Sequence, residues 1–187
     1  MGIVELVLIA VGLSMDAFAV SICNGMAVEN LRLRDACKFG LFFGFFQAAM
    51  PLIGYFAGKA FSGYVSAVDH WVAFALLAFI GGKMLYEAVK GDGEKCVSNP
   101  LQFKVLFTLA VATSIDALAV GVTFAFMEMN IWLSILTIGA ITFVISTFGA
   151  MIGKKAGVFL GSRAEIVGGL ILVFMGAKIL IEHLFFS

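Results

Sequence analysis

Six long apolar runs are the feature that most constrains what this chain can fold into. Each is close to the roughly 20 helical residues that cross the hydrocarbon core of a bilayer. The runs lie at residues 4–27, 39–58, 71–90, 105–127, 131–153 and 164–185. With 62% hydrophobic and only 13% charged residues, the 187-residue chain is far more apolar than a soluble domain of this length. We therefore predict an all-α integral membrane protein with six transmembrane helices.

Basic residues gather on one side of these predicted helices. Nine of the twelve Lys and Arg residues fall in the first, third and fifth loops: Arg32, Arg34, Lys38, Lys90, Lys95, Lys104, Lys154, Lys155 and Arg163. The loops on the opposite side hold only Lys59. Because cytoplasmic loops carry the excess of Lys and Arg, we expect both termini to lie outside.

The chain also contains an internal repeat. Residues 14–20 (SMDAFAV) and 114–120 (SIDALAV) are 100 positions apart and identical at five of seven positions. Ile53-Gly54 in the second run likewise matches Ile152-Gly153 in the fifth. Since each copy would hold an odd number of helices, three, the second copy must cross the membrane in the opposite sense. The predicted parts are a first three-helix repeat at 1–90, a cytoplasmic linker at 91–103 and a second, inverted three-helix repeat at 104–187.

An aspartate occupies the same position in both copies. Asp16 is the only charged residue between positions 5 and 29, and Asp116 is the only one between positions 104 and 128. A charge at the centre of a membrane helix costs about 2.5–3.5 kcal/mol on insertion scales, so a duplicated pair favours function over packing. Two carboxylates facing each other between the first and fourth helices could bind one cation.

The residue types available in the runs favour a hard divalent cation. Carboxylate, hydroxyl, amide and carbonyl oxygens suit manganese and magnesium, whereas thiolate and imidazole suit copper and zinc. We predict Asp16 and Asp116 as the primary metal ligands. Weaker candidates for the same site are Ser14, Gln47, Thr113, Ser114 and Thr147.

Gln47 stands out among the weaker candidates. An amide near the middle of a span needs a partner, and Pro51, one turn later, can open the hydrogen-bond ladder of the helix. Hydroxyls are more often explained by hydrogen bonds back to their own helix. This interpretation applies to Ser14, Thr113, Ser114, Thr123, Thr142, Ser146 and Thr147.

Two Lys–Glu pairs repeat between the halves of the chain. Lys83 with Glu87, and Lys178 with Glu182, have the i, i+4 spacing of side chains that can neutralise each other near a helix end. The alternative is a gate or proton relay at each membrane face, because inversion would place one pair inward and the other outward.

Several patterns limit the partners and the energy source. The chain has no G-x-x-x-x-G-K-[ST] phosphate loop, so ATP is not expected. Twelve acidic residues balance twelve basic ones, which gives no reason to expect nucleic acid. Cys23, Cys37 and Cys96 form no C-x-x-C pair and are interpreted as free thiols. These patterns favour a secondary mechanism that exchanges metal for protons on the same carboxylates, and they leave the oligomeric state open.

Three segments resemble a known family. Residues 13–19 (LSMDAFA), 113–121 (TSIDALAVG) and 163–169 (RAEIVGG) look like the bacterial manganese exporter family, often called MntP. The resemblance covers essentially the whole chain. It implies efflux of Mn²⁺ from the cytoplasm, with Mn²⁺ as transported substrate and no cofactor, by a multi-pass protein of the inner (plasma) membrane. It also implies that Asp16 and Asp116 are functional residues within the membrane.

Other functions fit parts of the same pattern. Amino-acid exporters share a similar helical plan, so the substrate could be another divalent cation or a cationic amino acid held by the same aspartates. A membrane enzyme or assembly factor has the least support, because no further acid, base or nucleophile lies near either aspartate in the sequence. We therefore predict a transporter and not an enzyme.

Overall fold

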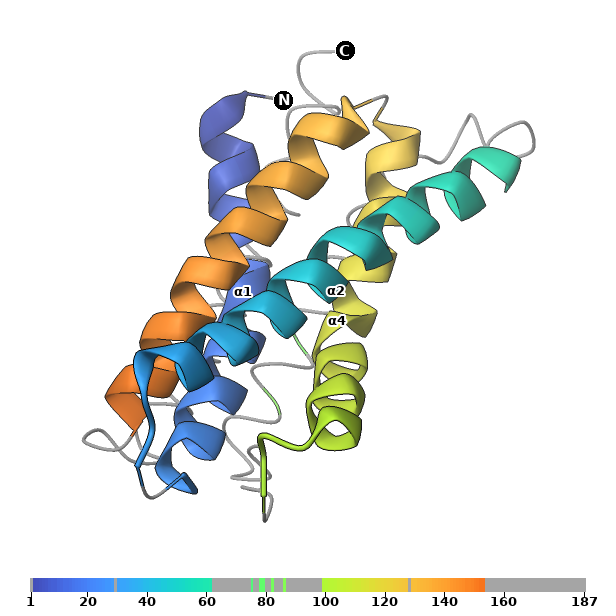
Figure 1. Cartoon of the computed structure of the whole chain (residues 1–187). Helices are drawn as coiled ribbons and strands as arrows, with labels where there is room; N and C mark the ends of the chain where they lie inside the picture. The colour runs from blue at the N-terminus through green and yellow to red at the C-terminus, as the bar shows by residue number, and fades with distance from the viewer. Residues whose placement is uncertain are drawn as a thin grey trace.

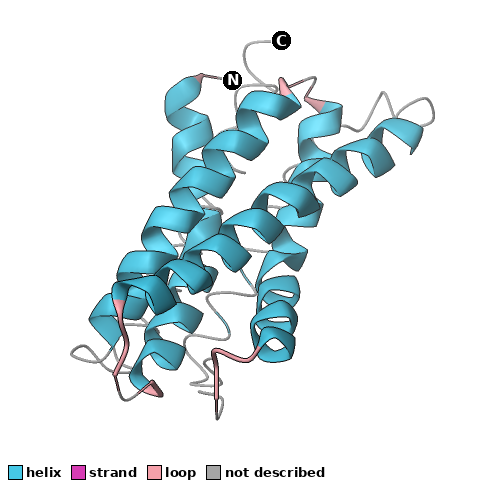
Figure 2. Ribbon diagram, viewed as in Figure 1, coloured by secondary structure: helices cyan, strands magenta, loops and turns pink. Residues whose placement is uncertain are grey.

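The computed structural model describes residues 2–28, 30–61, 75, 78, 79, 82, 86, 99–127 and 129–153. Within these residues all regular secondary structure is helical (Figure 2). Helix α1 spans Ile3–Met26, α2 spans Leu33–Phe61 and α4 spans Phe103–Phe126. A further helix, Ile131–Gly153, follows α4 after a short turn.

These four helices are long and apolar enough to cross a membrane, with mean hydropathies of 1.5 to 2.2 over their most apolar stretches. Three of them begin and end within two residues of the predicted runs. The exception is α2, which starts six residues before the predicted position 39. Its extra first turns are polar, and Lys38 Nζ lies 2.9 Å from Asp35 Oδ1 at the exposed helix start. A carboxylate there also complements the helix dipole.

The structure corrects the predicted six transmembrane helices to four. Only the runs at 4–27, 39–58, 105–127 and 131–153 correspond to membrane-length helices within the described residues. Hydropathy shows that a run is apolar enough for a membrane, but it does not establish one continuous helix of that length. Of the run at 71–90, only positions 75, 78, 79, 82 and 86 are described, each of them helical. The run at 164–185 lies outside the described residues.

Neighbouring helices approach closely at small residues. Helix α1 and α4 run in opposite directions, and so do α2 and Ile131–Gly153 (Figure 1). Gly44 of α2 meets Gly139 of Ile131–Gly153, where a Cβ atom added to Gly44 would lie 2.8 Å from the Gly139 carbonyl oxygen. Such backbone contact is how membrane helices without bulky interfaces associate.

The glycine contacts of α2 with α4 are repeated between Ile131–Gly153 and α1. Gly54 and Gly58 of α2 lie against Leu118 and Val122 of α4. In the same way, Gly149 and Gly153 lie against Phe18 and Ile22 of α1. The equivalent positions are thus 95 residues apart in one helix pair and 100 in the other. The alignment of Gly54 with Gly153 expected from the sequence is one helical turn out of register, because Gly149 makes the equivalent contact.

The core of the bundle is divided into two apolar clusters. One lies toward the end of the bundle that carries Arg32, Arg34, Lys38 and Lys104, and we name it the basic-end cluster. Its buried members are Ala17, Val20, Ala36, Phe39, Phe43, Leu106, Ala110 and Ala150. The second, the far-end cluster, has as buried members Leu6, Ile9, Ala10, Leu13, Tyr55, Ala117, Val120, Phe124, Ala125, Ile131 and Ile138.

The cysteines differ from their interpretation as free thiols. Cys37, partly buried near the start of α2, is free. Cys23 in α1 is disulfide-bonded, which corrects the prediction for this residue. Three cysteines without a C-x-x-C pair cannot be paired from spacing alone. Cys96 lies outside the described residues.

Candidate functional site

A layer of polar side chains separates the two apolar clusters. In α1 the far-end cluster stops at Leu13 and the basic-end cluster starts at Ala17, while in α4 the boundary falls between Ala110 and Ala117. In α2 the same gap lies between Phe43 and Tyr55, and in Ile131–Gly153 it lies between Ile138 and Ala150. We call the side chains in these gaps the polar layer: Ser14, Asp16, Gln47, Thr113, Ser114, Asp116, Thr142, Ser146 and Thr147.

Both predicted aspartates belong to this layer. Asp16 and Asp116 are each the fourteenth residue of a 24-residue helix, so they lie about 20 Å from the helix start at 1.5 Å per residue. Both side chains are partly buried, and both take part in interactions within the protein. Because α1 and α4 run in opposite directions, the equivalent positions bring the two carboxyl groups to similar depth near the centre of the bundle.

Gln47 is fixed in the layer by a contact between helices. Its Nε2 donates a hydrogen bond of 2.9 Å to the main-chain oxygen of Leu13 in α1, one turn before Asp16. The amide orientation follows from this contact, because a carbonyl oxygen can only accept. The other amide atom, Oε1, is buried and has no hydrogen-bond partner among the described residues. Gln47 thus presents an unpaired acceptor within the polar layer.

Pro51 supplies a second acceptor at the same residue. It lies inside α2 and has no N–H, so the main-chain oxygen of Gln47, four residues earlier, loses its helical donor. Gly121 of α4 packs directly against Pro51. Gln47 therefore has a side-chain oxygen without a hydrogen-bond partner and a main-chain oxygen that lacks its helical N–H donor.

Most hydroxyls in the layer bond back to their own helix, as predicted. Ser14 donates to the Val11 oxygen at 2.8 Å, and Ser114 donates to the Val111 oxygen at 3.1 Å, which preserves the repeat. The other two such bonds are those of Thr113 to Leu109 at 3.0 Å and Thr147 to Phe143 at 2.7 Å. A hydroxyl that donates in this way keeps its oxygen lone pairs for a ligand.

Thr142 and Ser146 break this rule. Both are completely buried, and neither hydroxyl has a hydrogen-bond partner in the described part of the protein. Sequence reasoning grouped them with the back-bonded hydroxyls and preferred Thr147 as the candidate ligand. One pattern in the sequence could have distinguished them from Thr147: Thr142, Ser146, Gly149 and Gly153 are spaced so that they share one helix face.

The remaining predicted site residues cannot be placed. Lys83, Glu87, Lys178 and Glu182 lie outside the described residues, so the gate or relay they might form stays a prediction. Within the described ranges, no group of three or more His, Cys, Asp and Glu side chains could hold a metal ion. A cation in the polar layer would therefore depend on neutral oxygens in addition to the two carboxylates.

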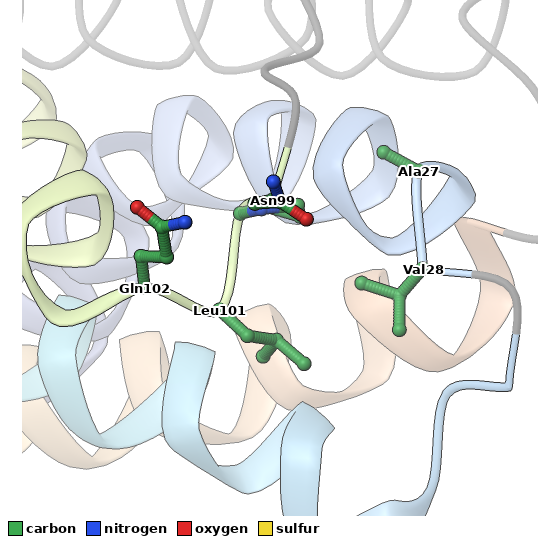
Figure 3. Close-up of a pocket in the computed structure, with 6 residues that line it drawn as sticks. Ala27, Val28, Asn99, Leu101 and Gln102 are labelled. Atoms are coloured by element: carbon green, nitrogen blue, oxygen red, sulfur yellow. The ribbon is translucent and has the colours of Figure 1, made fainter.

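Two pockets lie at opposite ends of the α1 and α4 pair. The larger, about 560 Å³, is at the basic end and is lined by Ala27, Val28 and residues 99–102 (Figure 3). The smaller, about 230 Å³, is at the far end and is lined by Gly2, Ile3, Leu6, Met127, Met129, Asn130, Leu133 and Ser134. Ala27 is eleven residues from Asp16, or about 16 Å along the helix. Both pockets thus lie outside the polar layer, at the two ends of the same helix pair.

Comparison with known proteins identifies the family. A family model described as "Putative manganese efflux pump" (MntP) matches residues 30–180. The chain belongs to this family. A relative from Mannheimia succiniciproducens, named putative manganese efflux pump MntP, is 54% identical, and the alignment covers 100% of both chains.

Further relatives with that name cover nearly the full length. One from Clostridium botulinum is 51% identical over 98% of this chain and 96% of its own. One from Methanosarcina mazei is 52% identical over 95% of each chain. No solved structure matches the chain. Family membership, together with four membrane-length helices, establishes a multi-pass membrane protein of a transporter family.

Proposed function

We propose that this protein exports Mn²⁺ from the cytoplasm across the inner membrane, in exchange for protons, through the polar layer. Membership of a family described as manganese efflux pumps supports the substrate and the direction. The observation that carries the mechanism is the position of Asp16 and Asp116, in a polar layer enclosed between two apolar clusters. The positive-inside rule directs the basic end of the bundle toward the cytoplasm.

The two carboxylates would couple the ion to protons. Each carboxylate can hold either the metal or a proton, and burial in a low-dielectric layer makes an unpaired charge costly. Mn²⁺ therefore replaces up to two protons when it binds, and protons return when it leaves. The neutral oxygens of the layer suit a hard divalent ion, which prefers oxygen ligands.

Cellular manganese content tests the substrate and the aspartates together. A bacterium lacking its own exporter would express the wild type, Asp16→Asn or Asp116→Asn at matched membrane levels. We expect the wild type to lower cellular manganese, and Asp16→Asn and Asp116→Asn to leave it unchanged. Asp35→Asn is the matched control, because Asp35 is an aspartate in the exposed first turn of α2 and pairs with Lys38. Unchanged manganese content in cells that express the wild type would refute Mn²⁺ as the substrate. Export by both Asp16→Asn and Asp116→Asn would refute the aspartate site.

Proton coupling needs a separate measurement. In proteoliposomes holding a pH-sensitive dye, addition of Mn²⁺ should move protons in the opposite direction, and Asp16→Asn should abolish the signal. Equal Mn²⁺ transport with a collapsed and an imposed proton gradient would exclude exchange.

A further inference from the structure

Three buried oxygen atoms of the polar layer have no hydrogen-bond partner in the described part of the chain: Gln47 Oε1, Thr142 Oγ1 and Ser146 Oγ. All three side chains are 0% exposed. An unsatisfied buried polar group destabilises a protein, and more so where water cannot compensate inside a bilayer. Their presence together in one layer therefore indicates a ligand that is not part of the polypeptide.

The three residues lie on matching faces of two helices. Gln47, Pro51, Gly54 and Gly58 form one face of α2 at spacing i, i+4, i+7 and i+11. Thr142, Ser146, Gly149 and Gly153 form the same face of Ile131–Gly153, each 95 residues later. The glycines of both faces touch an aspartate-bearing helix. Each face thus has two glycines that fix the helix contact, and before them lie the unpaired oxygens: that of Gln47 on α2, and those of Thr142 and Ser146 on Ile131–Gly153.

The glycine contacts determine where the hydroxyls lie. Gly149 packs on Phe18 and Gly153 on Ile22, so α1 and Ile131–Gly153 run in the same direction and stay in register along this face. Ser146 precedes Gly149 by one turn, which brings it to the turn of α1 just before Phe18, where Asp16 lies. Thr142 lies one turn further toward the far end. On α2, Gln47 reaches α1 through its hydrogen bond to the main-chain oxygen of Leu13.

We propose that Thr142 and Ser146 are ligands of the transported cation, acting with Gln47 Oε1 as the neutral part of its coordination shell. The proposal rests on the proposed function and extends it from the two aspartates to a second helix pair. A hard divalent ion takes about six oxygen ligands, and two carboxylates leave several positions unfilled. Two carboxylates already balance the charge of a divalent cation. Neutral oxygens can therefore complete the coordination shell without adding excess negative charge.

The test compares metal binding with stability in the purified full-length protein. Thr142→Val and Ser146→Ala remove one hydroxyl each and nearly conserve shape. Thr137→Val is the matched control, because Thr137 is on the same helix, is partly exposed and donates to the Leu133 oxygen at 2.8 Å. Mn²⁺ affinity would be measured by the loss of the free-ion electron paramagnetic resonance signal, and stability by the unfolding temperature in detergent.

We expect Thr142→Val and Ser146→Ala each to weaken Mn²⁺ binding about tenfold and to slow manganese efflux from cells. The unfolding temperature of the metal-free protein should stay the same or rise by about 2–4 °C, because an unsatisfied hydroxyl has been removed. Thr137→Val should leave affinity and efflux within twofold of wild type. Weaker binding without loss of stability is the result that a packing role would not produce.

The outcomes separate this proposal from the proposed function. If Asp16→Asn abolishes Mn²⁺ binding while both hydroxyl variants bind like wild type, the hydroxyl ligands are refuted and the aspartate site stands. If Asp16→Asn and Asp116→Asn both bind and export like wild type, the proposed function itself fails. If the hydroxyl variants lose binding only in proportion to a fall in unfolding temperature, their role is structural and the proposal is overturned.

Discussion

Gln47 Nε2 donates a hydrogen bond to the main-chain oxygen of Leu13 at 2.9 Å, and this contact ties α2 to α1 one turn before Asp16. The donor end of the amide holds the two helices together, while the acceptor end remains available. The Gln47 side chain therefore has two roles: its N–H donor holds α2 against α1, and its oxygen is left for a ligand in the polar layer.

Replacing Gln47 separates these two roles. Gln47→Leu removes one hydrogen bond, worth about 1 kcal/mol, but it also removes a buried unpaired acceptor. We expect the free energy of unfolding to change by less than about 1 kcal/mol, with manganese efflux reduced at least tenfold. Denaturation in detergent and cellular manganese content would check this. Normal efflux would mean that the amide only ties the helices together.

Pro51→Ala should stabilise the helix at the expense of transport. The alanine N–H can bond the main-chain oxygen of Gln47, which a proline at position 51 cannot do. We expect the unfolding temperature to rise by a few degrees and the efflux rate to fall several-fold, as measured by thermal unfolding and ⁵⁴Mn release. An increase in stability with unchanged efflux would show that the Gln47 main-chain oxygen has no part in transport.

Gly54 should tolerate no side chain. A Cβ atom there would overlap the main-chain oxygen of Leu118, so α2 and α4 must separate. We expect Gly54→Ala to lower the free energy of unfolding by about 1–3 kcal/mol. Gly82→Ala is the control, since a Cβ atom at Gly82 meets nothing within 4 Å. Equal stability of the two variants would contradict the close contact between α2 and α4.

Cys37 should report which face of the membrane the basic end occupies. It is free and partly buried, near Arg32, Arg34 and Lys38 in sequence. A membrane-impermeant maleimide should label it in inside-out vesicles and not in intact cells, and Cys37→Ser should remove that label. Labelling from outside intact cells would contradict the assignment of the basic end to the cytoplasm.

Four of the helices could be predicted from the sequence because long apolar runs and helical length are directly related. The start of α2 was missed, since its first turns contain Arg34, Asp35 and Lys38 and hydropathy cannot detect a helix that continues beyond the bilayer core. The prediction of six spans was wrong, because four helices of membrane length are found within the described residues. The state of Cys23 was also out of reach, because spacing does not specify disulfide pairing.

The sequence pointed to some residues of the polar layer and not to others, and their role as metal ligands stays a prediction. Asp16 and Asp116 could be found because a charge in an apolar run is rare and theirs is repeated. Gln47 followed from its distance to Pro51. Residue type alone did not separate Thr142 and Ser146 from Thr147, because all three are hydroxyls on one helix. Only the three-dimensional structure shows that Thr147 bonds to Phe143 while the other two have no such partner among the described residues.

The apolar clusters on either side of the polar layer also bear on electrical leakage. Phe39 and Phe43 fill one cluster and Phe124 the other, all of them fully buried. A membrane voltage of 100 mV does about 2.3 kcal/mol of work on each elementary charge that crosses it. A continuous water-filled pathway through the protein would therefore let ions leak across the membrane. Under the proposed function the two apolar clusters would prevent such leakage, because an ion that has passed one cluster into the polar layer is still separated from the opposite side by the other.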